Sequence, residues 1–317
     1  MGIKDKRVSY KPFEYPEVME FVDRINQTFW VHSELDFTGD VQDFHTALEP
    51  HEKEVIIRSM LGISQVEVGV KSFWGSLYSH FPKPEFNGLG ATFAESEFRH
   101  SESYSRIISV LGLEHKFGTL LDIPIFKEKV DMINKHLHPD LDIVGKLLYF
   151  TIITENTALF SLFANVLSLT RFKGKMKNVS NIIAWTSADE DCHAAGGIYL
   201  LNKLREEGYL TDRMVEAIRV SSKEYIKFEG KILDWIYEHG ELNMFSKEDM
   251  LNFMKYRVDT AFNKLNIKPV FNITPEQYAP MKWFDEEIYA NSLDDFFAKK
   301  PVDYTKHDKP VTGNDLF

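Results

Sequence analysis

At 317 residues, the chain is long enough to bury one large core or two small ones, and its 44% hydrophobic and 27% charged residues are ordinary for a soluble globular protein. Its net charge of −11, with scattered basic residues, argues against nucleic-acid binding, because phosphate contacts need clustered Lys and Arg. With Cys192 as its only cysteine, the chain cannot form an intrachain disulfide, and we expect a reducing cytoplasm. The N-terminus has no apolar stretch of the kind that a secretory signal needs.

Glycine and proline residues divide most of the sequence into long segments with helical periodicity. We predict helices at 16–30, 49–80, 86–112, 140–172, 178–206, 211–239 and 246–265, the last beginning with a capping box at Ser246. No alternating apolar pattern is long enough to predict a sheet, so the expected fold class is all-α. The pattern weakens after about residue 268, and we expect a helical domain at 1–299 followed by a flexible tail at 300–317.

One predicted helix has the length and apolar character of a membrane span, from Leu147 to Thr170. Glu155 and Asn156 lie at its centre, where an ionised carboxylate in a bilayer would be costly. Neither an aromatic belt nor an asymmetry of basic flanks supports insertion. We therefore expect a buried helix of a soluble bundle, with no membrane partner.

Four of the predicted helices carry an apolar face that is interrupted near its middle by a glutamate, and on two of them a histidine follows three residues later. These residues are Glu67, Glu97, His100, Glu155, Glu190 and His193. A single glutamate on such a face is most often ion-paired, and a single Glu-x-x-His is common on solvated helices. Four glutamates on four apolar faces are harder to explain as ion-paired or solvated residues, because burying each unpaired carboxylate is unfavourable.

Charge counting favours a metal site. Two divalent cations would balance four buried carboxylates, and one imidazole per metal in an oxygen-rich set suits iron or manganese. One glutamate from each of two helices plus Glu-x-x-His from each of two others is the known ligand pattern of ferritin-like dimetal proteins. We therefore predict a ferritin-like helical bundle with a dimetal-carboxylate site between four core helices.

The sequence resembles the small, radical-generating subunit of class I ribonucleotide reductase from Trp30 to the C-terminus. Residues 97–104, Glu-Phe-Arg-His-Ser-Glu-Ser-Tyr, match the family's Glu-x-x-His-Ser-x-Ser-Tyr segment, and residues 189–193, Asp-Glu-Asp-Cys-His, match its Asp-Glu-x-x-His segment. Phe29 and Trp30 match the aromatic pair that precedes the bundle. The resemblance implies that the six residues above bind two transition-metal ions per chain.

The resemblance also implies roles for other residues. Tyr104, about 6 Å beyond His100 along the helix, would store a radical. Trp30 and Asp189 would carry the oxidising equivalent outward, and Tyr304 in the tail would relay it to a large subunit. Each has a simpler alternative: Tyr104 as a core tyrosine, Trp30 as a packing anchor, Asp189 as a solvated helix residue and Tyr304 as a chance tail residue.

Glu67 departs from the family's commonest pattern, which has aspartate there, and resembles variants that use manganese. Manganese is therefore the favoured metal, with iron or a mixed manganese/iron pair as the alternatives. Lys71, four residues after Glu67, could tune that ligand or attract an anionic oxidant, or it could be an ordinary surface lysine. Whether Tyr104 or the metal pair holds the oxidant stays open.

We expect a cytoplasmic homodimer that makes a one-electron oxidant for ribonucleoside-diphosphate reduction. Because reduction at the ribose needs a dithiol and this chain has only Cys192, the substrate site would belong to a separate large subunit. An activating flavoprotein is left open as a further partner. The rival functions are a stand-alone ferritin-like oxidase, which would not need Trp30 or the tail, and an iron-storage protein, which would assemble into a shell.

Overall fold

A computed structural model describes residues 2–138 and 140–288, with the side chains of 65, 67–71 and 119–121 outside the description. Within these ranges the chain folds into helices and connecting loops, and no described residue lies in a β-strand. This confirms the predicted all-α class. The predicted tail, 300–317, lies outside the described residues.

The helices follow one another along the chain as α1 (Val18–Gln27), α2 (Thr38–Thr46), α3 (Pro50–Gly75), α4 (Leu77–His80), α5 (Pro84–Val110), α6 (Pro124–His136), α7 (Ile143–Tyr149), α8 (Phe160–Lys173), α9 (Lys177–Glu206), α10 (Asp212–Ile236), α11 (Lys247–Lys264) and α12 (Pro275–Tyr278). Short 3₁₀ turns lie at His32–Glu34, Glu114–Asp122 and Ala279–Met281. A π-helical segment, Phe150–Glu155, joins α7 to the turn that precedes α8.

Each predicted helix has a counterpart, but three details differ. The predicted helix 49–80 is divided at Ser76 into α3 and α4, and the predicted helix 140–172 is interrupted by the π-helical segment and the turn at 156–159. Helices α2 and α6 and the short α12 were not predicted. Helix α6 starts at Pro124, which suits the first helical position because proline lacks only an N–H that has no partner there.

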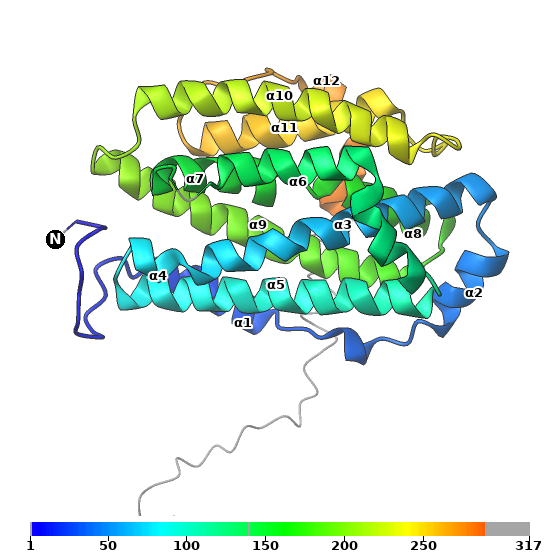
Figure 1. Cartoon of the computed structure of the whole chain (residues 1–317), viewed down its shortest axis with the longest axis horizontal. Helices are drawn as coiled ribbons and strands as arrows, with labels where there is room; N and C mark the ends of the chain where they lie inside the picture. The colour runs from blue at the N-terminus through cyan, green and yellow to red at the C-terminus, as the bar shows by residue number, and fades with distance from the viewer. Residues whose placement is uncertain (1, 139, 289–317) are drawn as a thin grey trace, which may run out of the picture.

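The core is a four-helix arrangement in which α3 packs along α5, α8 packs on both α9 and α3, and α5 contacts α9. Helices α10 and α11 pack on each other and cover one side, while α1 covers the opposite side against α5 and α9 (Figure 1). Long helices that run side by side hold the side chains of their middle turns at fixed distances, so they suit a site assembled from several helices.

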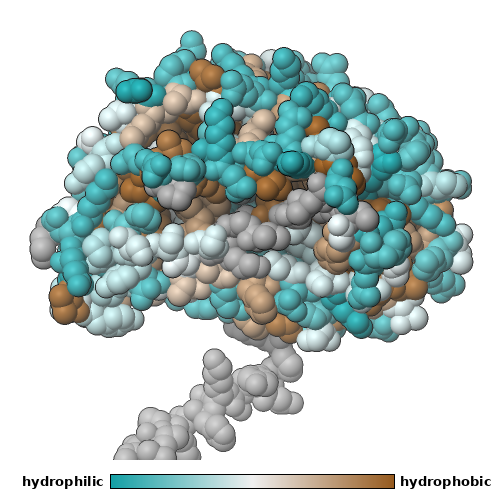
Figure 2. All heavy atoms as spheres, in the orientation of Figure 1, coloured by the Kyte–Doolittle hydropathy of each residue, from teal (hydrophilic) through white to brown (hydrophobic). Residues whose placement is uncertain are grey.

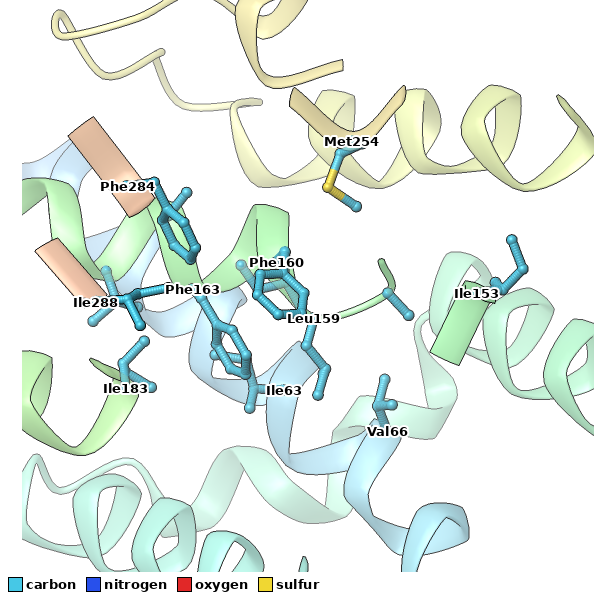
Figure 3. Close-up of a cluster of buried hydrophobic side chains, with 14 of the residues drawn as sticks. Ile63, Val66, Ile153, Leu159, Phe160, Phe163, Ile183, Met254, Phe284 and Ile288 are labelled. Atoms are coloured by element: carbon cyan, nitrogen blue, oxygen red, sulfur yellow. The ribbon is translucent and has the colours of Figure 1, made fainter. Parts of the chain in front are cut away.

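The segment Ile143–Lys173 is long and apolar enough to span a membrane, and its most apolar 18-residue window is entirely buried inside the protein. Phe160 and Phe163 of α8 lie among Ile63 and Ile183 from neighbouring helices and Phe284 from the end of the described chain (Figure 3). The rings of Phe160 and Phe284 have their centroids 5.8 Å apart. The segment is therefore a core element, as the sequence predicted, and the outer face in view is mostly hydrophilic (Figure 2).

Helix α9 approaches the π-helical segment closely at Gly197. A Cβ added there would overlap the Oγ1 of Thr151 and lie 3.0 Å from its Cβ. Both residues are buried, and the branched Thr151 side chain has little freedom to move aside. Glycine at this position thus permits the close packing of the two segments.

We expect Gly197→Ala to lower the free energy of unfolding by about 1–3 kcal/mol, because an extra methyl group in a packed core forces neighbours apart. Gly145→Ala is the matched control, since no atom lies within 4 Å of a Cβ added there. It should keep or raise stability, by up to about 1 kcal/mol, because alanine is the better helix former. Urea unfolding of both variants measures the difference, and equal stability would contradict the close approach.

Candidate metal centre

The predicted metal site has ligand residues on three structural elements whose side chains are described. Helix α5 carries Glu97 and His100, α9 carries Glu190 and His193, and the π-helical segment ends at Glu155. All five side chains are buried. One ligand atom from each of Glu97, Glu155, Glu190 and His193 lies within 4.8 Å of the others. Three positions along an α-helix return to nearly the same face, which is why each Glu-x-x-His pair points the same way.

The Nδ1 atoms of both imidazoles point into this cluster. His193 Nδ1 lies 2.8 Å from Glu97 Oε1, 3.3 Å from Glu190 Oε2 and 3.5 Å from Glu155 Oε2. His100 Nδ1 lies 3.2 Å from Glu97 Oε2 and 3.2 Å from Glu190 Oε1. One Nδ1 atom carries at most one proton, so it cannot serve two or three carboxylates with hydrogen bonds.

The Nε2 atoms of the same two histidines point away from the cluster, and each has a hydrogen-bond partner there. His193 Nε2 lies 2.7 Å from the hydroxyl of Ser96, which itself donates to the Phe93 carbonyl at 2.8 Å and must therefore accept from the imidazole. His100 Nε2 lies 3.1 Å from Asp189 Oδ2, a carboxylate oxygen that can only accept. Both outer partners require a proton on Nε2, so each neutral imidazole presents the Nδ1 lone pair to the cluster.

The carboxyl groups of the cluster have shifted pKa values. Burial, and then the charges of Glu190 and Glu97, raise the pKa of Glu155 well above its ordinary value. Burial also acts to raise the pKa of Glu190, but hydrogen bonds from His100 and His193 outweigh it and lower that pKa. The pKa of Glu97 is lowered as well, because His193 and His100 outweigh burial and the charge of Glu190.

Both imidazoles have pKa values well above their ordinary value. Burial acts to lower them, but the hydrogen bond to Asp189 leads the effects that raise the pKa of His100, and the charge of Glu97 leads those that raise the pKa of His193. His100, His193 and Glu155 therefore favour their protonated forms, which offsets negative charge in the cluster. Those protons take the place that cations would take.

The donor atoms fit a dimetal site. Glu97 Oε1, Glu155 Oε2 and Glu190 Oε1 are buried, and none accepts a hydrogen bond of ordinary geometry from the described residues. His193 Nδ1 faces Glu97 Oε1 and Glu155 Oε2, and His100 Nδ1 faces Glu190 Oε1. Carboxylate oxygens with one imidazole nitrogen per metal make a donor set that suits iron and manganese.

Two neighbours of the cluster were not predicted as functional residues. Trp74, at the end of α3, donates from Nε1 to Glu155 Oε1 at 2.8 Å, and Ser96 fixes the tautomer of His193. Trp74 could have been predicted, because its spacing of seven residues from Glu67 puts both positions on one helical face. No pattern in the sequence around Ser96 indicates a functional role for it. The π-helical segment that presents Glu155 was also missed, and such segments are frequent at functional sites.

Trp30 and Asp189 lie beside the cluster, and their role in carrying an oxidising equivalent stays a prediction. Trp30 Nε1 donates to Asp189 Oδ2 at 3.0 Å, the same oxygen that faces His100 Nε2. The indole is 3% exposed and is stacked on the His100 ring, with centroids 5.8 Å apart and planes 12° apart. Tyr104 is fully buried, one turn beyond His100 on α5.

The remaining predicted site residues are not placed by the structure. Glu67 and Lys71 belong to α3, but their side chains are outside the described ones. Tyr304 lies outside the described residues.

Comparison with known proteins points to one family. Residues 7–280 match the family described as "Ribonucleotide reductase, small chain". A probable ribonucleoside-diphosphate reductase small subunit of invertebrate iridescent virus 6 is 25% identical, over 100% of this chain and 99% of that protein. A counterpart from invertebrate iridescent virus 3 is also 25% identical, over 95% of this chain and 85% of that protein.

Solved structures share the fold. The ribonucleotide reductase R2 subunit from Clostridium botulinum superposes with a TM-score of 0.80 at 17% identity, over 89% of this chain and 91% of that one. The dimanganese(II)-NrdF from Streptococcus sanguinis gives a TM-score of 0.76 at 18% identity, over 91% and 99%. Since the family match covers most of the sequence and both buried Glu-x-x-His pairs, the chain belongs to the ribonucleotide reductase small-chain family.

Proposed function

We propose that this chain, as the small subunit of a ribonucleoside-diphosphate reductase, holds two transition-metal ions in its core and delivers a one-electron oxidant to a separate large subunit. The observation that carries the proposal is the pair of imidazole Nδ1 atoms that face three buried carboxylates, while each Nε2 has a hydrogen-bond acceptor outside the cluster. Neither a stand-alone oxidase nor a storage protein is favoured by the family match.

In this proposal the ligands are Glu67, Glu97, His100, Glu155, Glu190 and His193. When bound, the metal pair supplies oxygen activation and a one-electron oxidising equivalent. The protein supplies four negative charges, two oriented imidazoles and a core closed to water. Asp189 and Ser96 keep the imidazoles in the ligand tautomer, and Trp74 holds one oxygen of Glu155.

The favoured metal is manganese, with iron or a mixed pair as the alternative. Glu67 supports manganese, because it resembles the manganese-using variants of the family at the first ligand position. The similarity in fold to a dimanganese protein agrees with this preference. Lys71 would then tune Glu67 or attract an anionic oxidant. The stored oxidant resides either on Tyr104 or on the metal pair.

The exit route for the oxidant runs from His100 through Asp189 to Trp30. These three groups are joined by two hydrogen bonds to one carboxylate oxygen, and Trp30 follows the half-exposed Phe29 in sequence. From Trp30 the route would continue through Tyr304 in the tail to the large subunit. The chain cannot provide the reducing dithiol itself, because its one cysteine, Cys192, is buried and burial raises its pKa to about 11.

The remaining features are also proposals. The chain would act as a homodimer in the cytoplasm, without nucleic acid or membrane as partners, and an activating flavoprotein is an open addition. Residues 1–299 would form the helical domain, and 300–317 would form the segment that the large subunit binds.

Metal binding should release protons, and the apparent affinity should therefore rise with pH. His100, His193 and Glu155 have raised pKa values, which favour their protonated forms, and these protons must leave before the ligands coordinate. For each proton released, Mn(II) affinity should increase about tenfold per pH unit between pH 6 and 8. Calorimetry in buffers of different ionisation enthalpy counts the protons.

A matched pair of variants controls this measurement. Glu229 is a fully buried glutamate outside the cluster that accepts hydrogen bonds from Ser161 and Tyr225. Glu229→Gln should keep both the proton release and two metals, whereas Glu155→Gln should bind Mn(II) more weakly and release fewer protons. A pH-independent affinity in the wild-type protein would contradict the assignment of these ligands.

Removal of residues 312–317 should separate partner binding from metal binding. We expect the shortened chain to fold, dimerise and load metal as the full chain does, but to lose activity with its large subunit, because the apolar Leu316 and Phe317 would no longer dock. A peptide copying 312–317 should inhibit the full-length pair by competition. Full activity after the deletion would favour the stand-alone oxidase.

A further inference from the structure

Arg257 of α11 connects the two protein segments that carry Glu155 and Glu190. Its Nε donates to the backbone carbonyl of Asn156 at 2.6 Å, and its Nη2 donates to Asp191 Oδ1 at 2.7 Å. Asn156 directly follows Glu155, and Asp191 directly follows Glu190. Helix α11 therefore joins these two segments through the guanidinium group of a residue that is only 7% exposed.

The interruption after the π-helical segment explains why the Asn156 carbonyl is available. The Ala158 amide donates to the Ile153 carbonyl at 2.7 Å, and the Phe160 amide donates to the Thr157 carbonyl at 3.2 Å. The Phe160 amide would be the donor to the Asn156 carbonyl in a regular α-helix, so that carbonyl is left for Arg257. A buried carbonyl without a donor costs about 1–3 kcal/mol, so Arg257 stabilises the interrupted backbone.

The contact between Arg257 and the interruption is reciprocal and closely packed. The Asn156 side chain donates from Nδ2 to the Arg257 carbonyl at 2.9 Å, so each residue bonds the backbone of the other. The guanidinium carbon lies 3.2 Å from the centre of the Phe160 ring, which begins α8. These contacts fix the backbone on both sides of the turn that follows Glu155.

The charge of Arg257 is balanced locally. Asp191 is its ion-pair partner at 2.7 Å, so the pair adds no net charge beside the cluster. Its effect on the metal site is therefore geometric. A planar guanidinium with two donor edges suits this task, because it can bond two acceptors in a fixed relative orientation, which an ammonium group cannot do as well.

We propose that Arg257 is a positioning residue that holds Glu155 at a fixed place relative to Glu190. The inference rests on the proposed function, since it takes Glu155 and Glu190 as metal ligands. Without the guanidinium, the backbone after Glu155 loses its tie to α9, and the Glu155 carboxylate can move relative to the ligands on that helix. Loss of such an outer support costs about 10–100-fold in metal affinity.

The test is Arg257→Met, which keeps the length of the side chain and removes its donors. Arg219→Met is the matched control. Arg219 also donates to two acceptors, in its case the backbone carbonyls of Lys268 and Pro269, and it also lies over a phenylalanine ring, but it ties α10 to the loop after α11. Mn(II) affinity and stoichiometry are measured by chelator competition, and the spin coupling between the two ions by electron paramagnetic resonance.

We expect Arg257→Met to weaken at least one Mn(II) site by about 10–100-fold and to change the coupling signal, while Arg219→Met leaves both at wild-type values. Asp191→Asn should weaken binding in the same direction, and the double variant with Arg257→Met should lose little more, since both changes break one connection. Arg257→Lys retains the charge but not the two-edged geometry, and it tests the same point if the methionine variant does not fold.

Wild-type affinity and coupling in the Arg257 variants would overturn the inference, as would equal losses in the Arg219 control. Either result would leave the proposed function standing, provided that the wild-type chain binds two Mn(II) ions. A wild-type chain that binds none would instead refute the proposed function itself.

Discussion

The structure depends on one unfavourable feature, the burial of several carboxylates in the middle of a helical core. Glu97, Glu155 and Glu190 are removed from water inside a core built mainly of apolar side chains. Buried charge of one sign is tolerated only when protons, cations or hydrogen-bond donors compensate it. The raised pKa values of the two imidazoles and of Glu155 favour protons there, and a pair of divalent ions would replace those protons.

The surrounding fold directs the donor atoms inward. Ser96 and Asp189 each accept from an imidazole Nε2, so both Nδ1 atoms face the cluster, and Trp74 fixes one oxygen of Glu155. Helices α5 and α9 hold their Glu-x-x-His pairs on regular turns. Glu155 instead comes from an interrupted helix, whose freed backbone groups need donors from elsewhere in the chain. The contact with Arg257 meets that need and joins the interruption to α9.

The helical periodicity of the sequence was sufficient to predict the regular helices and the faces that they bury. The faces of α5 and α9, the burial of the apolar helix around Glu155 and the all-α class follow from spacings of three and four residues. The π-helical segment could not be predicted, because its apolar sequence continues the helical pattern without a proline or glycine at the interruption. Trp74, Ser96 and Arg257 act through contacts between helices, which one sequence does not specify. Glu67, Lys71 and Tyr304 stay predictions, because the structure does not describe their side chains.

The central claim is that the buried cluster binds two metal ions between α5, α9 and the π-helical segment. Crystals of the full chain grown with Mn(II) and Fe(II) would test it through anomalous difference maps at both absorption edges. The account predicts two peaks per chain in contact with Glu97, Glu155 and Glu190, each with one histidine Nδ1 as a ligand. Peaks only at the protein surface, or a cluster filled by hydrogen-bonded side chains without metal, would contradict it.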